Sequence, residues 1–150
     1  EVFGTLDELN AAIGIVITCT EIPLTIESFL AEVQQNIFNI CGEIAAPQFK
    51  SIDQNNVVAV ENFINDLNET LPPLKDFVLP GGNSHSAHCH LARAICRRAE
   101  RELCKLADEK EINQESFKYL NRLSDALFVI ARTLAKQDNG EEIIWKHPKV

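Results

Sequence analysis

The chain contains no methionine and only one tryptophan and one tyrosine among its 150 residues. It also has no uninterrupted apolar run that approaches the roughly 20 residues of a membrane-spanning helix. Positive charge is scarce, because 14 Lys and Arg residues face 22 Asp and Glu residues, for a formal net charge of −8. A chain this acidic is poorly suited to non-specific binding of nucleic acid or an anionic membrane. We therefore expect neither as a partner.

Disulfide chemistry is also missing from the sequence. The five cysteines are odd in number and form no C-x-x-C pair. Each lies within an apolar or helical pattern, where free cysteine behaves as a small hydrophobic residue. This usage predicts a reducing compartment, the cytoplasm or, in a eukaryotic host, the mitochondrial matrix. Because Met is absent and Glu1 opens without a signal peptide, we expect the sequence to be a fragment of a longer product.

Apolar residues recur at helical spacing along nearly the whole chain, and no convincing strand pattern appears. The pattern predicts an all-α fold, a five-helix antiparallel bundle forming a single domain over residues 1–150. Thr5, with Glu8 three residues later, predicts a capping box at the start of the first helix. Asp53 predicts the N-cap of the third. The other helices are expected at about 25–46, 85–107 and 114–137, with Phe38 and Leu91 facing inward.

Arginine is concentrated in the fourth predicted helix, where Arg93, Arg97, Arg98 and Arg101 fall within nine residues. At about 100° per residue, the first, second and fourth of these share an arc of roughly 80°, and His90 and Glu100 join it. The planar guanidinium group suits bidentate contacts with phosphate oxygens. The spacing therefore indicates a polyphosphate clamp, and a solvated helix face with ordinary ion pairs is the alternative.

The fifth predicted helix carries a second polar stripe, formed by Asn121, Asp125 and Arg132. Asn121 and Asp125, at i and i+4, are suited to orient a ribose, a base or metal-bound water, although solvated surface residues show the same pattern. Asp7, in the first turn of the first helix, is either a site residue or a charge that complements the helix dipole.

Three histidines, His85, His88 and His90, lie close together in the sequence. Spacing of i, i+3 is compatible with metal binding, but no second Cys or His pair completes a site, and the Glu-x-x-His pairs of a di-iron bundle are missing. We therefore predict no metal site in the protein itself. Just before a Pro-Gly-Gly turn, Phe77 is an apolar loop residue that fits either the core or the wall of a planar ligand's site.

Five segments in this order resemble the PduO-type ATP:cob(I)alamin adenosyltransferases. They are FGTLDELN at 3–10, QNIFNICGEIA at 35–45, FVLPGG at 77–82, HLARAICRRAER at 90–101 and YLNRLSD at 119–125. The resemblance implies transfer of the 5′-deoxyadenosyl group of ATP to Co(I) of a corrinoid, with release of triphosphate. It also implies a homotrimer with active sites between subunits, Mg²⁺ with ATP, and cobalamin as the second substrate. An adenosylcobalamin-dependent enzyme is the candidate recipient of the product.

The resemblance also assigns residue roles. Contact with ATP falls to the fourth and fifth helices, namely to Arg97, Arg98, Glu100, Arg101 and Asn121, with Asp125 beside them. Arg93 and Asp7 match a pair that joins across the subunit interface next to the corrin, and Phe77 matches the aromatic residue that crowds the lower face of cobalt. A Gly/Thr/Lys-rich segment that wraps the triphosphate is expected before Glu1. Two alternatives stay open: a non-catalytic nucleotide- or corrinoid-binding bundle that delivers cofactor, and a purely structural helical module.

Overall fold

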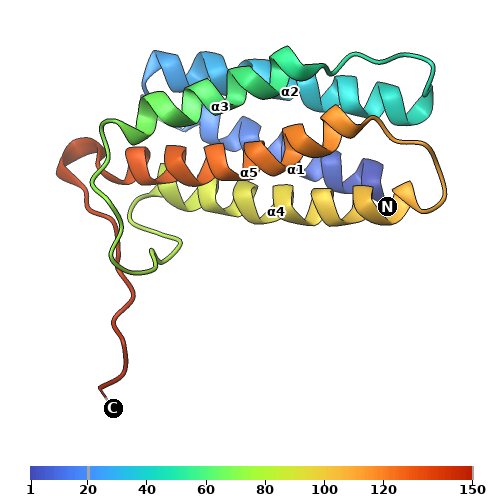
Figure 1. The fold of residues 1–150 in the computed structure, drawn as a ribbon. Helices are drawn as coiled ribbons and strands as arrows, with labels where there is room; N and C mark the ends of the chain where they lie inside the picture. The colour runs from blue at the N-terminus through green and yellow to red at the C-terminus, as the bar shows by residue number, and fades with distance from the viewer. Residues whose placement is uncertain (20, 150) are drawn as a thin grey trace.

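The computed structural model describes residues 1–19 and 21–149 and is all-helical (Figure 1). Its elements are α1 (Val2–Thr18), α2 (Leu24–Ala45), α3 (Gln54–Asn68), α4 (Ser84–Ala107), α5 (Gln114–Ala135) and the short 3-10 helix η1 (Gln137–Asn139). The predicted five-helix fold is confirmed. Across the described ranges, every helix is too short or too polar to cross a membrane.

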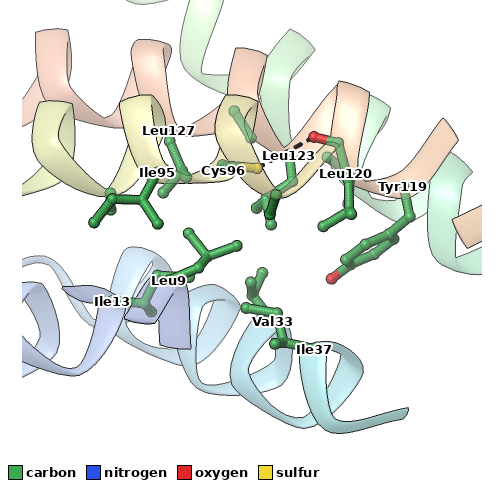
Figure 2. Packing of buried hydrophobic residues seen from close by; sticks show 14 of the residues in the cluster. Leu9, Ile13, Val33, Ile37, Ile95, Cys96, Tyr119, Leu120, Leu123 and Leu127 are labelled. Carbon is green, nitrogen blue, oxygen red and sulfur yellow. Dashed lines mark hydrogen bonds between the residues drawn. The ribbon is translucent and has the colours of Figure 1, made fainter. Parts of the chain in front are cut away.

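The core lies between the helices, with α5 packed against α3 and α4, and α1 packed against α4 and α2. Figure 2 shows side chains from α1, α2, α4 and α5 converging on this interior. The contribution of α5 follows its apolar spacing and consists of fully buried residues: Leu120, Leu123, Leu127, Ile130 and Leu134. Burial of a leucine-sized side chain is worth about 1.5–3 kcal/mol. The stripe predicted from the sequence therefore fixes which face of α5 points inward.

Helix starts differ from the prediction at one place. Helix α1 begins at Val2, so Thr5 lies inside it, and its Oγ1 donates to the Glu1 carbonyl at 3.2 Å. The predicted capping box at Thr5 is therefore wrong, because this hydroxyl bonds backward within the helix. Asp53 does cap α3, since its carboxylate accepts hydrogen bonds from the backbone N–H groups of Asn55 and Asn56.

Two apolar residues predicted to face inward are exposed, Phe38 at 66% and Leu91 at 52%. Two polar residues of α2, Asn36 and Glu43, are buried among its apolar residues. Asn36 Nδ2 donates to the hydroxyl of buried Tyr119 at 3.2 Å, and Glu43 is fully hydrogen-bonded inside. A buried polar group is tolerated once it has partners, so apolar character alone does not choose the inward face.

The C-terminal tail (141–147) and the loop that precedes α4 leave the bundle at the same end (Figure 1). An isolated antiparallel bridge joins Val78 to Ile144. Asn83 fixes this end of the bundle, because its side chain accepts from Ser86 N and donates to the Leu134 carbonyl at 2.7 Å. One asparagine thus caps the start of α4 and bonds the last turn of α5.

Candidate functional site

Helix α4 presents one continuous cationic face. Arg93 is half-buried, whereas Arg97 and Arg101 are exposed. Arg93 and Arg97 are neighbours at i and i+4 on this face. Burial, and then the positive charge of Arg97, lowers the pKa of Arg93. Among the side chains that the structure describes, none forms an ion pair with these three arginines. Adjacent cations without carboxylate partners favour the binding of an anion.

A groove of about 580 Å³ lies at the N-terminal half of this face. It brings together two residues that the sequence singled out separately, Phe77 from the loop and Arg93 from α4. Phe77 is 76% exposed, so its ring is free to contact a ligand. Arg93 Nε donates to His90 Nδ1 at 3.3 Å, and the His90 ring meets Phe128 edge-on with ring centroids 6.1 Å apart. Two charged loop residues also line the groove, Lys75 and Asp76. The groove therefore combines aromatic walls with the oriented cation of Arg93.

A second groove, of about 540 Å³, lies farther along α4, between α3, α4 and α5. Glu100 and Asn121 meet there, since Asn121 Nδ2 donates to Glu100 Oε1 at 3.0 Å. The sequence had linked these two residues only through the resemblance. Other lining residues escaped the sequence analysis, among them Glu61, Cys104, Phe117, Lys118 and Arg122. Of these residues, the sequence pointed only to Arg122, because it directly follows Asn121.

The two grooves share one helix face. Arg93 and Glu100 are seven residues apart, nearly two full turns, which places them about 10 Å apart along the helix axis. Arg97 lies between them on the same face. A ligand bound in one groove and a ligand bound in the other would both lie near Arg97, because Arg97 is only about 6 Å along the axis from Arg93 and about 4.5 Å from Glu100.

Other predicted residues lie elsewhere in the chain. Asp7 is exposed on α1 and lines a separate hollow of about 270 Å³ with Gln35 and Phe38. In the described part of the chain Asp7 has no ion-pair partner. Arg98 points toward α1, where it pairs with Glu8. The proposed roles of Asp7 and Arg98 therefore stay predictions.

The polar stripe predicted on α5 is divided by the fold. Asp125 accepts from Arg122 Nη1 at 2.8 Å, close to Asn121. Arg132, by contrast, is buried and pairs with Glu142 of the tail at 2.6 Å. Arg132 keeps its place on the face of α5 that carries Asn121 and Asp125, but it is not available to a ligand, because the tail covers the last turns of α5. This contact had no signal in local spacing, since Glu142 lies beyond the end of the helix.

Two of the three clustered histidines, His88 and His90, have different partners. His88 Nδ1 lies 3.3 Å from Ser84 Oγ and 3.7 Å from Cys19 Sγ. His90 accepts from Arg93 instead. Burial is the main cause that lowers the pKa of His90, which favours its neutral form. Among the residues described, no group of three or more His, Cys, Asp and Glu side chains is arranged to hold a metal ion.

Residues 1–134 match the family described as cobalamin adenosyltransferase. The chain is 36% identical over 146 residues to the cobalamin adenosyltransferase of Cupriavidus metallidurans, covering 97% of this chain and 79% of that protein. It is 35% identical to mouse corrinoid adenosyltransferase MMAB, covering 97% of this chain and 66% of that protein. Against corrinoid adenosyltransferase PduO of Citrobacter freundii the identity is 34%, and the chain spans 45% of that protein's length.

Solved structures agree with these relatives. A variant PduO-type ATP:corrinoid adenosyltransferase from Lactobacillus reuteri, complexed with cobalamin and ATP, superposes with a TM-score of 0.91 at 30% identity, covering 99% of this chain and 83% of that one. Another variant of the enzyme, complexed with ATP, gives a TM-score of 0.89 at 31% identity, covering 97% and 85%. Sequence and fold thus agree over nearly the whole chain, which belongs to the cobalamin adenosyltransferase family, a family of transferases, as the resemblance predicted.

Proposed function

We propose that this chain transfers the 5′-deoxyadenosyl group of ATP to the Co(I) centre of a corrinoid. Co(I) attacks C5′, a cobalt–carbon bond forms, and the C5′–oxygen bond breaks with its electron pair leaving on triphosphate. The observation that carries the proposal is the arginine face of α4, on which Arg97 lies between the two grooves. The groove of Phe77 and Arg93 is called the aromatic groove from here on, and the groove of Glu100 and Asn121 the polar groove. A reaction between one planar and one polyanionic substrate requires two such sites side by side.

The polar groove is the proposed site for ATP. Glu100 and Asn121 supply hydrogen-bonding groups for the nucleoside, with Asp125 and Arg122 at the edge. Arg97 and Arg101, with Arg98 from the adjacent face, supply positive charge for the leaving triphosphate, where negative charge builds up in the transition state. Because the nucleophile is already electron-rich, no general base is needed.

Mg²⁺ is expected to arrive with ATP. This ion is usually held by phosphate oxygens and water with one or two carboxylates, and not by a cage of protein ligands. The described residues fit that mode, because they form no cluster of three or more candidate ligands and Glu100 is the carboxylate on the arginine face. When bound, the ion would neutralise charge on the phosphates.

The aromatic groove is the proposed corrinoid site. Phe77 stands exposed at its edge, and Phe128 and His90 form the wall beside Arg93. We propose that the Phe77 ring occupies the lower face of cobalt and excludes an axial ligand. Removal of a donating ligand and of water makes reduction of Co(II) easier, since the surroundings of a metal control its redox potential.

The active protein is proposed to be a homotrimer with active sites between subunits. Asp7 and Arg93 both lack an ion-pair partner within the described part of one chain, and Asp7 lies on the exposed side of α1. A neighbouring subunit would bring Asp7 to Arg93 beside the corrin. We further propose that the protein works in the cytoplasm, or in the mitochondrial matrix of a eukaryotic host, and passes its product to an adenosylcobalamin-dependent enzyme.

The direct test is incubation of the full-length protein, with the segment expected before Glu1, with Mg-ATP and chemically reduced cobalamin, and adenosylcobalamin is followed by absorbance. We expect stoichiometric triphosphate and repeated turnover. Binding of ATP and corrinoid without turnover would instead support a carrier protein. A bundle that binds neither would show no thermal shift, whereas a ligand at 100 times its Kd stabilises a protein by about 2.7 kcal/mol.

A further inference from the structure

We infer that the C-terminal tail (141–147) positions Phe77, and that the buried ion pair between Arg132 and Glu142 anchors the tail for that purpose. The inference rests on the proposed function, because it concerns the loop that presents Phe77 to the corrinoid. It adds positioning residues that lie outside both grooves. Arg132 and Glu142 line neither groove, so they would act through the loop, apart from the smaller effect of the Glu142 charge, which opposes the lowering of the His90 pKa by burial.

Arg132 holds both segments at once. Its side chain is 6% exposed and that of Glu142 is 8% exposed. Nε donates to Glu142 Oε1 at 2.6 Å, and Nη2 donates to the Pro72 carbonyl at 2.8 Å. One guanidinium group on α5 thus fixes the start of the loop and the start of the tail. A single planar fork is needed for this geometry, which the point charge of lysine does not reproduce.

From this anchor the tail runs antiparallel to the loop. Leu79 N donates to the Ile143 carbonyl at 2.7 Å, and Trp145 N donates to the Phe77 carbonyl at 2.8 Å. At the far end His147 Nε2 lies 2.6 Å from Asp76 Oδ1. Within the part of the chain that the structure describes, the backbone groups of residues 74–80 form hydrogen bonds only with the tail. The tail is therefore the element that defines the backbone position of Phe77.

The Phe77 ring has little other support. Phe77 is 76% exposed. Its ring lies beside that of Trp145, with the ring centroids 6.1 Å apart and the ring planes tilted by 57°. No burial in the core restrains it. A ring that must occupy one face of a metal needs restraint, because misplacement of a reacting or excluding group by about 1 Å can cost on the order of 10²-fold in rate.

Two glycines, Gly82 and Gly140, allow the tail to pass close to the end of α5. A Cβ on Gly140 would lie 2.3 Å from the Ala135 carbonyl oxygen, and a Cβ on Gly82 would lie 3.2 Å from the Glu141 carbonyl oxygen. Gly82 also has φ of 101°, a conformation that other residues rarely adopt. A larger residue at either position would push the tail away from the end of α5.

The experiment uses Glu142→Gln, with Glu141→Gln as the matched control on the exposed neighbouring position. The change removes the carboxylate that neutralises buried Arg132, so the tail should detach while the five helices stay folded. Trp145 is the only tryptophan, so its fluorescence reports directly on the tail. We expect a red-shifted emission, greater quenching by acrylamide, and faster amide hydrogen exchange at Leu79, with unchanged far-ultraviolet circular dichroism.

The functional readout is the fraction of four-coordinate Co(II) corrinoid in the presence of ATP. In Glu142→Gln it should fall toward the value of Phe77→Ala, with kcat lower by about 10- to 100-fold and KM for ATP unchanged. Arg132→Lys should behave like Glu142→Gln. Glu141→Gln should match the wild-type protein in every measurement.

Two results would overturn the inference. One is unchanged Trp145 fluorescence and Leu79 exchange in Glu142→Gln, since the ion pair would then not anchor the tail. The other is a detached tail with an undiminished four-coordinate signal, since the tail would then not position Phe77. If the full-length wild-type protein fails to convert corrinoid at all, the proposed function fails, while the fluorescence and exchange measurements still decide whether the tail orders the Phe77 loop.

Discussion

The carboxamide of Asn121 on α5 donates a 3.0 Å hydrogen bond to Glu100 Oε1 on α4, and so joins two of the three helices that form the polar groove. Both side chains lie at a surface, where neither contributes much to the core. The hydrogen bond orients the Asn121 carbonyl oxygen and leaves the second Glu100 oxygen available to a ligand. An oriented amide and carboxylate at the end of an arginine face is the arrangement expected for nucleotide binding.

Substitution Asn121→Ala should weaken ATP binding with little effect on folding. Loss of one hydrogen bond to the uncharged nucleoside costs about 0.5–1.5 kcal/mol, which corresponds to roughly a 2- to 13-fold higher KM for ATP. Steady-state kinetics at saturating corrinoid measure the change. Lys110→Gln is the control, because Lys110 is exposed and lies outside the lining of this groove. A KM for ATP equal to that of the wild-type protein would exclude Asn121 from the site.

Arg97→Ala should impair the chemical step. The exposed Arg97 has no ion-pair partner among the described side chains, so the melting temperature should not change. Removal of one donor to a developing negative charge typically lowers kcat by about 10²–10³-fold. Lys105→Ala, an exposed cation on the same helix, should retain normal turnover. Near-normal kcat in Arg97→Ala would refute its contact with the triphosphate.

Phe77→Ala should leave the fold intact, because the ring is 76% exposed. Without the ring, an axial ligand or water can reach the lower face of cobalt, and Co(II) should remain five-coordinate. The Co(II) absorption and magnetic resonance spectra in the presence of ATP report the coordination number directly. Leu79→Ala, which shortens another exposed apolar side chain of the same loop, should preserve the four-coordinate signal. An undiminished signal in Phe77→Ala would show that ligand exclusion lies elsewhere.

Glu43→Gln should destabilise the bundle. The buried carboxylate accepts hydrogen bonds from Ser51 N, from Ile52 N at 2.7 Å and from Ser116 Oγ at 2.6 Å, and Asn113 Nδ2 also donates to it. The glutamine amide has only one acceptor oxygen, and its NH2 group would face N–H and O–H groups that now donate to the carboxylate. We therefore expect the free energy of unfolding to fall by about 2–4 kcal/mol. Urea denaturation measures it. Glu32→Gln, on the exposed side of α2, should change stability by less than about 0.5 kcal/mol.

The cysteines should differ sharply in reactivity. Burial raises the pKa of Cys89 and of Cys96 well above the ordinary value, so at pH 8 neither forms the reactive thiolate. Cys104 is exposed in the polar groove and should react first with a thiol reagent. Mass spectrometry of the labelled protein should show Cys89 and Cys96 modified only after unfolding. Saturating ATP should slow the labelling of Cys104, and unchanged labelling would argue against ATP in this groove.

Much of the fold was predictable from local pattern. Helix positions follow from apolar residues at 3.6-residue spacing, and the inward face of α5 was identified correctly because its leucines dominate the burial energy. The exceptions are informative. Phe38 and Leu91 were assigned to the interior on apolarity alone, but polar groups with specific partners, such as Asn36 with Tyr119, took interior positions.

The sequence by itself determined the helices, the arginine face of α4 and the family, since each depends on residues near one another in the chain. Only the tertiary structure decided that Phe77 meets Arg93 in one groove, that Asn121 bonds Glu100, and that Arg132 is buried against Glu142. The physical reason is that helical periodicity sets the direction of a side chain within its own helix. Which distant segment lies opposite depends on how the helices pack and on where loops and tail close over them.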